Sequence, residues 1–295
     1  MEVWVVLSMG AAFLQNLRSA LQKSLTGRVA VLGATSARFL FALPWALLAA
    51  FLLTRAGGMP GLTPAFVLWA LAGAGAHVAA QMLLLRLFTF RNFAVGNAFA
   101  RTETILAAVV GAVLLGDWLG FWPALGILVS VAGVILLSLN GGFRRAGFDK
   151  AAALTGIACG LGFALSGVCY RAASLSLQGD AGYLPRAAVT VAFVILAQTL
   201  AMSVWMRLRA PGAITAVLRA WRVAGLVGLV GMLASLGWFS AFTLTSAAEV
   251  KAVGQIELLF SMATARLAFG ERPSAREIIG IALVGGGIVM LVLSG

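Results

Sequence analysis

Two glutamates stand inside apolar stretches of the sequence, where charged side chains are rare. Glu103 begins the segment ETILAAVVGAVLLGD, and Glu257 begins ELLFSMATARLAFGE. Ionisable groups in such stretches usually face an interior cavity or a partner, and they mark solute or proton pathways. We expect the two carboxylates either to bind the ammonium group of an amino acid or to carry a coupling proton. The alternative is structural pairing, of Glu103 with Arg101 and of Glu257 with Lys251 or Arg266.

Other polar side chains in the apolar stretches could serve the same chemistry. His77, the only histidine, is a third candidate for the coupling proton, although a lone histidine is also a common neutral packing residue. Gln81 follows one helical turn later, on the same face as His77. Arg101 could bind a substrate carboxylate with its planar guanidinium or form a structural ion pair. We therefore predict that His77, Gln81 and Arg101 contribute to a solute site.

Two amides and two aromatic residues extend this candidate site. Gln15 and Asn16 are adjacent within the first apolar run, and their amides could bond to other helices or contact the solute. Trp238 and Phe163 could form the wall of a pocket for an apolar side chain. Aromatic residues in helical bundles also serve as packing or interface anchors, which is the alternative for both.

The two glutamate segments are copies of one pattern, because a single constant shift along the sequence aligns them and several other residues. The aligned pairs are Gln81 with Ser235, Arg101 with Gln255, Glu103 with Glu257, Gly116 with Gly270, Gly126 with Gly280, Gly133 with Gly287 and Gly141 with Gly295. We interpret this register as an internal duplication. The duplication adds Ser235 and Gln255 to the candidate site.

The composition places the chain in a bilayer. Of 295 residues, 62% are hydrophobic and 10% are charged, against roughly half apolar and a quarter charged in a soluble domain. The net charge of +12 is spread singly or in pairs between apolar runs, which excludes the basic face of a nucleic-acid binder. The sequence contains no phosphate-binding loop, no nucleophile beside a base and no spaced metal ligands. We expect neither an enzyme nor a bound cofactor or metal.

Ten apolar runs are long enough to cross a membrane as helices. They cover residues 3–21, 29–53, 65–85, 94–115, 124–139, 151–171, 184–206, 223–244, 247–269 and 275–293. Residues 1–141 and 151–295 hold five runs each, and a polar hinge, 142–150, separates them. Because five is odd, the second half must enter the membrane from the other side, as in inverted-repeat transporters. We predict an all-α membrane protein of ten transmembrane helices in two inverted repeats around a central cavity.

Both halves end in the same sequence pattern. An apolar helix is followed by a turn of glycine and an acid (GDWL and GERP) and by a last helix with spaced glycines (PALGILVSVAGVILL and REIIGIALVGGGIVML). Over essentially the whole chain, this pattern resembles the EamA type of the drug/metabolite transporter superfamily. Where many members carry a proline early in the fourth and ninth helices, this chain has Glu103 and Glu257.

The resemblance implies a multi-pass transporter of the inner (plasma) membrane that works as a monomer or weak dimer. Its solute would be a small molecule, with amino acids, as in the YddG-like exporters, expected before drugs or other metabolites. An uncoupled channel or a structural membrane subunit is the alternative that the composition leaves open.

The basic residues and the resemblance predict opposite orientations. The loops after the odd-numbered apolar runs carry most of the lysines and arginines, so the positive-inside rule places both termini outside the cell. The resemblance implies termini in the cytoplasm. Arg38 and Arg186 fall at comparable places within their runs, and snorkelling of both head groups towards the membrane surface accounts for them.

Overall fold

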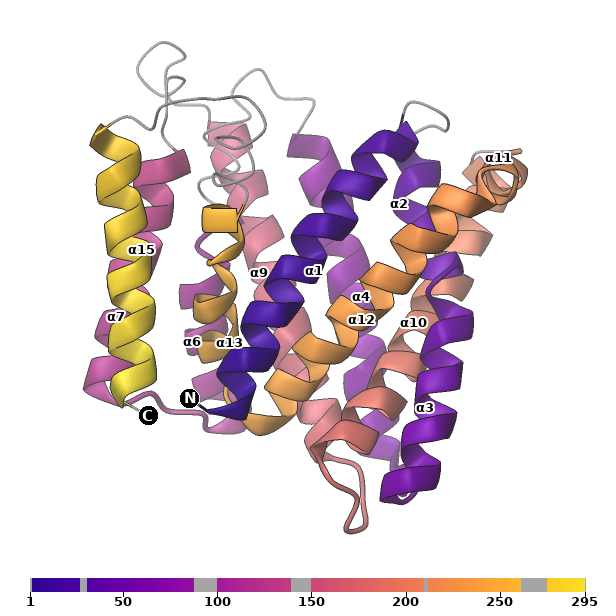
Figure 1. The fold of residues 1–295 in the computed structure, drawn as a ribbon, viewed down its shortest axis with the longest axis horizontal. Helices are drawn as coiled ribbons and strands as arrows, with labels where there is room; N and C mark the ends of the chain where they lie inside the picture. The colour runs from indigo at the N-terminus through magenta and orange to yellow at the C-terminus, as the bar shows by residue number, and fades with distance from the viewer. Residues whose placement is uncertain are drawn as a thin grey trace.

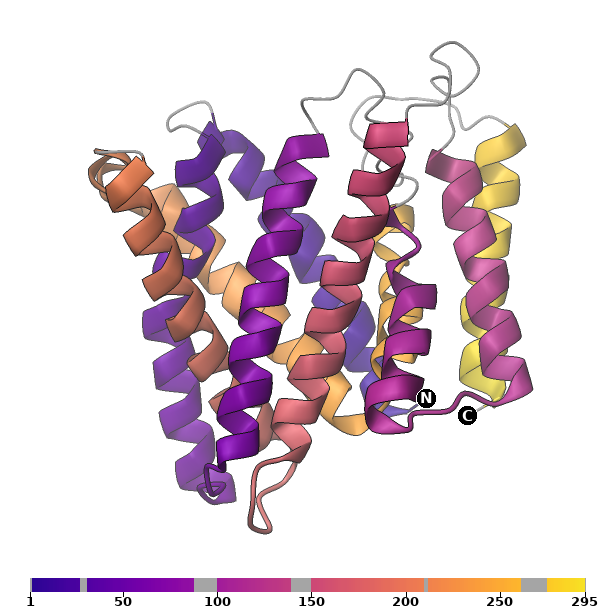
Figure 2. The same cartoon turned by 180° about the vertical axis from the view of Figure 1, so that it is seen from behind.

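The computed structural model describes residues 2–26, 31–87, 100–138, 150–209, 212–260 and 275–294. These residues fold into helices that stand side by side in one bundle (Figures 1 and 2). Apart from an isolated antiparallel bridge between Gly61 and Gln178, this part of the chain contains no strand. The prediction of an all-α protein is therefore confirmed.

The first half of the chain forms six helices in the described ranges, namely α1 (Val3–Thr26), α2 (Val31–Leu40), α3 (Leu43–Gly57), α4 (Pro64–Leu87), α6 (Glu103–Leu115) and α7 (Phe121–Ser138). The apolar run 29–53 is thus two helices and not one, because Pro44 in the first turn of α3 cannot continue the hydrogen bonds of α2. Gly116 ends α6 with φ of 69°, a conformation that glycine adopts at little cost.

The second half also forms six described helices, namely α9 (Lys150–Leu175), α10 (Tyr183–Arg209), α11 (Ala213–Arg219), α12 (Trp221–Leu244), α13 (Ala247–Gly254) and α15 (Ala275–Ser294). A capping box formed by Ser246 and Glu249 fixes the start of α13. Residues 142–149 of the predicted polar hinge lie outside the described residues, and Lys150 already belongs to α9.

Among the described residues, five helical segments are long and apolar enough to cross a membrane: Ser36–Gly57, Pro64–Leu84, Lys150–Leu175, Tyr183–Arg209 and Trp221–Leu244. Three further apolar segments, Glu103–Leu115, Phe121–Leu137 and Ile278–Leu293, are shorter. The protein therefore has the helices of a multi-pass membrane protein. Within the described ranges, length and composition do not establish the predicted ten spans. Parts of the predicted spans 94–115 and 247–269 lie outside the described residues.

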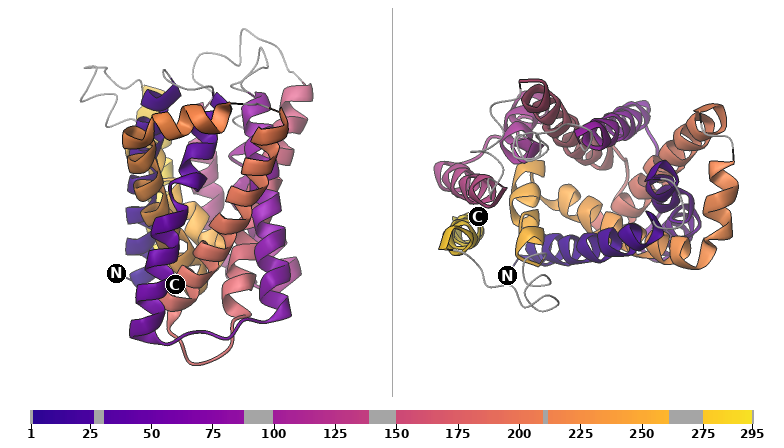
Figure 3. Two further views of the ribbon diagram at one scale, coloured as in Figure 1. Left: turned by 90° about the vertical axis from the view of Figure 1, so that its right-hand side faces the viewer. Right: turned by 90° about the horizontal axis from the view of Figure 1, so that it is seen from above.

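Both termini lie at one end of the bundle (Figure 1). We call this end the termini face; α1 begins there, and α6, α12 and α15 end there. The other end, which we call the opposite face, holds the ends of α1, α4, α7 and α10 and the start of α9. Viewed from above, α7 and α15 stand together at one edge of the bundle (Figure 3). The main cavity lies among other helices of the bundle.

Polar contacts between the two halves close the termini face. Arg171 at the end of α9 forms an ion pair of 2.8 Å with Asp117, which follows α6. The Thr63 hydroxyl donates to the Ser176 carbonyl at 2.9 Å. The bridge between Gly61 and Gln178 adds two backbone hydrogen bonds, of 2.8 and 3.0 Å. The loops on this face are therefore bonded across the halves.

Helices α7 and α15 touch through the glycines of the duplicated pattern. A Cβ atom added to Gly126 would lie 2.7 Å from the Gly287 carbonyl oxygen, and one added to Gly133 would lie 2.7 Å from the Gly280 carbonyl oxygen. The two helices are antiparallel, because the later residue of α7 meets the earlier residue of α15. Such close backbone contact is available only to residues without a side chain.

Replacing Gly287 with alanine should destabilise this helix pair. The new methyl group would lie 2.5 Å from the Gly126 carbonyl oxygen and 2.6 Å from the Ser130 amide nitrogen, so the helices would have to separate. We expect a loss of about 1–3 kcal/mol, the usual cost of overpacking, seen as a lower Tm of the purified protein in detergent. Gly286→Ala is the matched control, because no atom lies within 4 Å of its added Cβ. Equal Tm values for the two variants would contradict the close packing.

Candidate functional site

The helices that carry Glu103 and Glu257 are both interrupted just before the glutamate. Residues 101 and 102 form a turn before α6 begins at Glu103, and residues 255 and 256 form a turn between α13 and a short helical segment that begins at Glu257. In the second interruption, the amides of Gln255 and Ile256 bond three residues back, at 3.2 and 3.1 Å. Tight turns of this kind inside a helix often mark functional hinges. The two interruptions occupy aligned positions of the duplicated pattern.

A polar cavity lies beside these interruptions. Its widest part has a volume of about 430 Å³, within the range of small-molecule sites. Helices α1, α2, α4, α9 and α13 and the start of α6 contribute to its wall. The wall includes Ser19, Leu84 and Ala100, so the cavity widens towards the opposite face. A deeper part of about 140 Å³ extends towards α12.

Glu257 is linked to α1 and α12 through Gln15. The Gln15 side-chain nitrogen donates to the Glu257 carboxylate at 2.8 Å, and the indole nitrogen of Trp238 donates to the Gln15 side-chain oxygen at 3.1 Å. Asn16 donates to the backbone carbonyl of Glu257 at 3.4 Å. Because both ends of the Gln15 amide are bonded, its orientation is determined, and it connects Glu257 to the aromatic wall.

Glu103 pairs with a cation from the other half of the chain. The ammonium group of Lys251 lies 3.6 Å from the Glu103 carboxylate and 5.7 Å from the centre of the Phe163 ring. The structural alternative pairs Glu103 with Arg101 and Glu257 with Lys251 or Arg266. The structure shows Glu103 with Lys251, and Arg266 lies outside the described residues. A carboxylate at the first residue of α6 is also favoured by the helix dipole. The pair joins α6 to α13 across the cavity.

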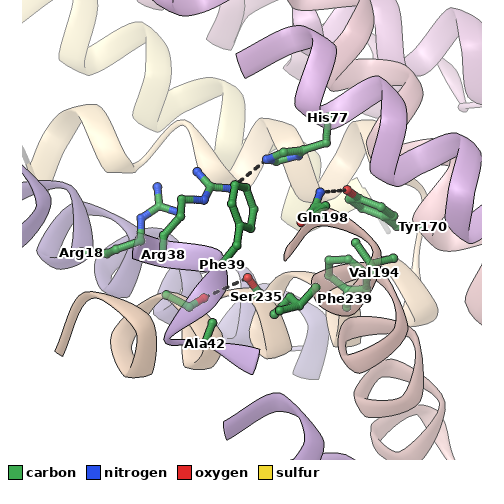
Figure 4. A pocket seen from close by; sticks show the side chains of 12 residues that line it. Arg18, Arg38, Phe39, Ala42, His77, Tyr170, Val194, Gln198, Ser235 and Phe239 are labelled. Carbon is green, nitrogen blue, oxygen red and sulfur yellow. Dashed lines mark hydrogen bonds between the residues drawn. The ribbon is translucent and has the colours of Figure 1, made fainter. Parts of the chain in front are cut away.

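Two arginines lie together on one wall of the cavity (Figure 4). Arg38 donates to Nε2 of His77 at 2.8 Å, and its guanidinium lies 4.5 Å from the centre of the Phe39 ring. Because arginine can only donate, Nε2 must accept, which places the His77 proton on Nδ1. Arg18 lies beside Arg38, and among the described residues its buried Nε has no hydrogen-bond partner.

Aromatic residues close the cavity towards the termini face. The rings of Tyr170 and Phe239 are stacked with centres 4.4 Å apart, and Trp238 stacks at 6.4 Å from Phe242. The Tyr170 hydroxyl accepts a hydrogen bond of 3.1 Å from Gln198. This layer, which we call the aromatic floor, separates the polar cavity from the Asp117–Arg171 ion pair.

The structure brings most of the predicted site residues to one place. The cavity is lined by Gln15, His77, Gln81, Arg101, Glu103, Phe163, Ser235, Trp238, Gln255 and Glu257. Asn16 is not part of this wall, and its described contact is to the backbone of Glu257. Gln81 and Ser235 line different parts, the wide one and the deep one. No described group of three or more His, Cys, Asp or Glu side chains could hold a metal ion.

Gln255 lies in the wall, but its amide is bonded to neighbouring helices. Its nitrogen donates to the Thr104 hydroxyl at 2.8 Å, and its oxygen accepts from the Ser130 hydroxyl at 2.6 Å. The side chain is buried. In this conformation Gln255 therefore ties its helix interruption to α6 and α7.

Sequence reasoning missed three cations of the site. Arg18, Arg38 and Lys251 all line the cavity. Arg38 therefore does not extend to the membrane surface, contrary to the prediction from the sequence. Arg186, for which the same prediction was made, donates instead to the carbonyls of Ala181, Leu177 and Gly179 at 2.9, 2.8 and 2.6 Å. A signal was available for Arg18, which follows Gln15 by three residues and so shares its helix face.

Comparison with known proteins agrees with this architecture. Residues 150–293, just under half of the chain, match the EamA-like transporter family, and this family implies a membrane transporter of small molecules. No curated protein matches the sequence. One solved crystal structure has a TM-score of 0.77 at 20% sequence identity, with 100% of this chain and 99% of that chain covered. At this identity the likeness concerns the fold alone.

Proposed function

From the match of residues 150–293 to the EamA-like transporter family, we propose that the protein is a secondary transporter that moves a small metabolite across the inner membrane by alternating access. The observation that carries this proposal is the polar cavity, because a volume of about 430 Å³ inside an apolar bundle is suited to a solute. Both mid-span glutamates contribute to its wall.

The helix contacts support two inverted five-helix repeats, which would complete ten spans. Contacts join α1 to α12, α4 to α9, α3 to α10 and α7 to α15. Exchanging the two halves converts the first two pairings into each other and leaves the other two unchanged. The contacts Gly126–Gly287 and Gly133–Gly280 are likewise converted into each other by the repeat alignment. Because α7 and α15 run in opposite directions, that exchange is an inversion, as in many secondary transporters.

Alternating access is supported by the difference between the two faces. The cavity widens towards the opposite face, while the aromatic floor and the Asp117–Arg171 pair close the termini face. The interruptions at 101–102 and 255–256 give the wall two places where short helices could tilt. In this proposal, the state seen here loads or releases the solute at the opposite face.

We propose a carboxylate-bearing metabolite as the solute, with amino acids as the class that the sequence predicts. Arginine side chains that line the cavity suit a carboxylate. The test is counterflow of labelled metabolites, amino acids first, in liposomes at two pH values. A carrier gives saturable exchange that is stimulated by solute on the other side, whereas a channel gives flux without such stimulation. No flux with any metabolite would favour a structural subunit.

The distribution of basic residues predicts that the termini lie outside the cell. At the opposite face stand Arg86, Lys150, Arg207, Arg209, Arg219 and Arg222, whereas Arg171 and Arg186 at the termini face are bonded to protein groups. By the positive-inside rule, the opposite face is cytoplasmic. A C-terminal reporter that is active only in the cytoplasm should therefore be inactive, and one that is active only outside should be active. The reverse pattern would contradict this orientation.

A further inference from the structure

Four exposed arginines stand at one corner of the opposite face, where α10 ends and α12 begins. We call this group the basic corner; it consists of Arg207 and Arg209 of α10, Arg219 of α11 and Arg222 of α12. The ion pairs of the described residues lie elsewhere in the bundle. The sequence contains no aspartate or glutamate in residues 181–248, which include all three helices, or in residues 3–102, which include the neighbouring α2. The corner therefore carries positive charge without a nearby acid from these segments.

The length of α10 places this corner at the level of the lipid headgroups. The helix has 27 residues, or about 40 Å at 1.5 Å per residue, whereas the hydrocarbon core of a bilayer is about 30 Å thick. Its last turn carries Arg207 and Arg209, and charged side chains in the hydrocarbon are costly. The end of α10 therefore extends out of the hydrocarbon into the headgroup layer.

Helix α11 lies across this end of the bundle and not along it (Figures 1 and 3). Its inner side buries Val217 in a cluster with Ala37 of α2 and Ala224 of α12. Its outer side exposes Leu218 and Arg219. Helices that lie in the plane of the membrane surface combine apolar and basic side chains in this way. The connection from α10 to α12 is thus built to rest on a lipid surface.

Two of the arginines lie over tryptophan rings at this corner. The guanidinium carbon of Arg209 is 5.6 Å from the centre of the Trp205 ring, and that of Arg222 is 5.6 Å from the centre of the Trp221 ring. Both indole side chains are exposed, and tryptophan favours the membrane interface. Contact with a ring face occupies none of the N–H donors of a guanidinium group. Each pair therefore offers donors for a phosphate beside an apolar surface for an acyl chain.

We propose that the basic corner binds an anionic phospholipid, with the headgroup phosphate held by its guanidinium groups and the acyl chains against the exposed side chains of Trp205, Leu208 and Leu218. Guanidinium groups bind phosphates through paired, charge-assisted hydrogen bonds, and clusters of four or more basic residues beside membrane helices bind anionic lipids. The exposed apolar side chains beside the charges favour a lipid over a water-soluble phosphate. The site lies outside the cavity and does not rest on the proposed solute.

Lipid binding is measured by native mass spectrometry on the purified full chain in detergent, which makes the result independent of membrane orientation. The protein is titrated with phosphatidylglycerol or with phosphatidylcholine of the same acyl chains, and the Tm of each mixture is recorded. We expect phosphatidylglycerol to bind about tenfold more tightly and to raise the Tm, because only its headgroup carries a net negative charge. Salt at about 1 M should reduce this difference by screening. Inorganic phosphate, which has no acyl chain, should not raise the Tm.

Substitution of the arginines tests where the lipid binds. Arg219→Gln and Arg222→Gln should each weaken phosphatidylglycerol binding about fivefold, the effect of one basic residue at a membrane surface, and the double variant roughly twenty- to thirtyfold. The double substitution to lysine keeps the charge without the planar donors and should retain part of the affinity. Arg55→Gln is the matched control, because Arg55 is also exposed and lies 5.0 Å from the centre of the Phe51 ring, at the other end of the bundle.

The outcomes distinguish a lipid site at this corner from general attraction to charge. Equal affinity for the two lipids, or phosphatidylglycerol binding that is unchanged in both Arg219→Gln and Arg222→Gln, overturns the inference. A loss in Arg55→Gln as large as in these two variants also overturns it, because any exposed arginine would then suffice. A rise in Tm with inorganic phosphate that equals the rise with phosphatidylglycerol indicates a site for a soluble anion and overturns the assignment to a lipid. If the double variants do not fold, the single variants and the comparison of the two lipids decide.

Discussion

Replacing Asp117 with asparagine should open the termini face to a water-soluble reagent. The Asp117 carboxylate accepts from Nε and Nη2 of Arg171 at 2.8 and 3.3 Å, and Arg171 also donates to the carbonyls of Phe242 and Thr245 at 2.9 and 2.7 Å. One arginine thus holds the end of α9, the turn after α6 and the end of α12 together. A charge-assisted hydrogen bond contributes about 1.5–3 kcal/mol, so its loss should shift the closed state by roughly ten- to a hundredfold.

A cysteine placed between α9 and α12, close in sequence to Arg171, measures the opening. Ser174 is buried and shares a hydrogen bond of 2.6 Å with Thr243, and Ser174→Cys in a chain without Cys159 and Cys169 supplies one thiol between α9 and α12. We expect Asp117→Asn to accelerate its labelling by a polar maleimide about ten- to a hundredfold. Asp180→Asn makes the same chemical change at an exposed position of this face and should have no effect. An unchanged rate in Asp117→Asn would show that the ion pair does not close the face.

Replacing Glu257 with glutamine should abolish the pH dependence of transport and slow it by about tenfold or more, as expected for the loss of a charged hydrogen-bond acceptor. Glutamine keeps an oxygen that can accept from Gln15, so the bond observed at 2.8 Å can persist while the exchangeable proton is lost. Glu257, Gln15 and Trp238 form a continuous chain of hydrogen bonds. Protonation of Glu257 would change its hydrogen bond with Gln15 of α1 and, through Gln15, the contact with Trp238 of α12. Proton binding would then alter the positions of side chains in the cavity wall.

Counterflow between pH 5.5 and 8 in liposomes measures this effect. Glu103→Gln is the comparison, because it leaves Lys251 without its counter-charge and should slow transport while the pH dependence persists. Glu2→Gln, at an exposed position outside the cavity, is the control for removal of a carboxylate. If the pH dependence survives in Glu257→Gln and disappears in Glu103→Gln, the proton is carried by Glu103. If both variants keep wild-type flux and pH response, the glutamates have only a structural role.

The sequence located the cavity because charges and amides stand out in an apolar chain. Glu103, Glu257, His77 and Arg101 were identified by residue type alone, and all four line one cavity. Sequence reasoning failed where side-chain direction decides the outcome. Arg38 has the sequence surroundings of a snorkelling residue, yet it points inwards to His77.

The fold was predictable at the level of helices but not at their interruptions. Hydropathy, which averages over a whole segment, places continuous apolar runs at 94–115 and 247–269 and is insensitive to a two-residue turn within them. The turns at 101–102 and 255–256 depend on contacts with other helices, such as the bonds of Gln255 to Thr104 and Ser130. A single sequence does not contain these contacts.

The hydrogen bond from Gln255 to Thr104 links the two halves of the chain mechanically. One end stands at the interruption in the second half, and the other end lies immediately after the interruption in the first half. A tilt of α6 would displace Thr104 and, through this hydrogen bond, the turn that follows α13. The two segments would therefore move together. A solute that touches only one glutamate would then still be sensed by both halves of the protein.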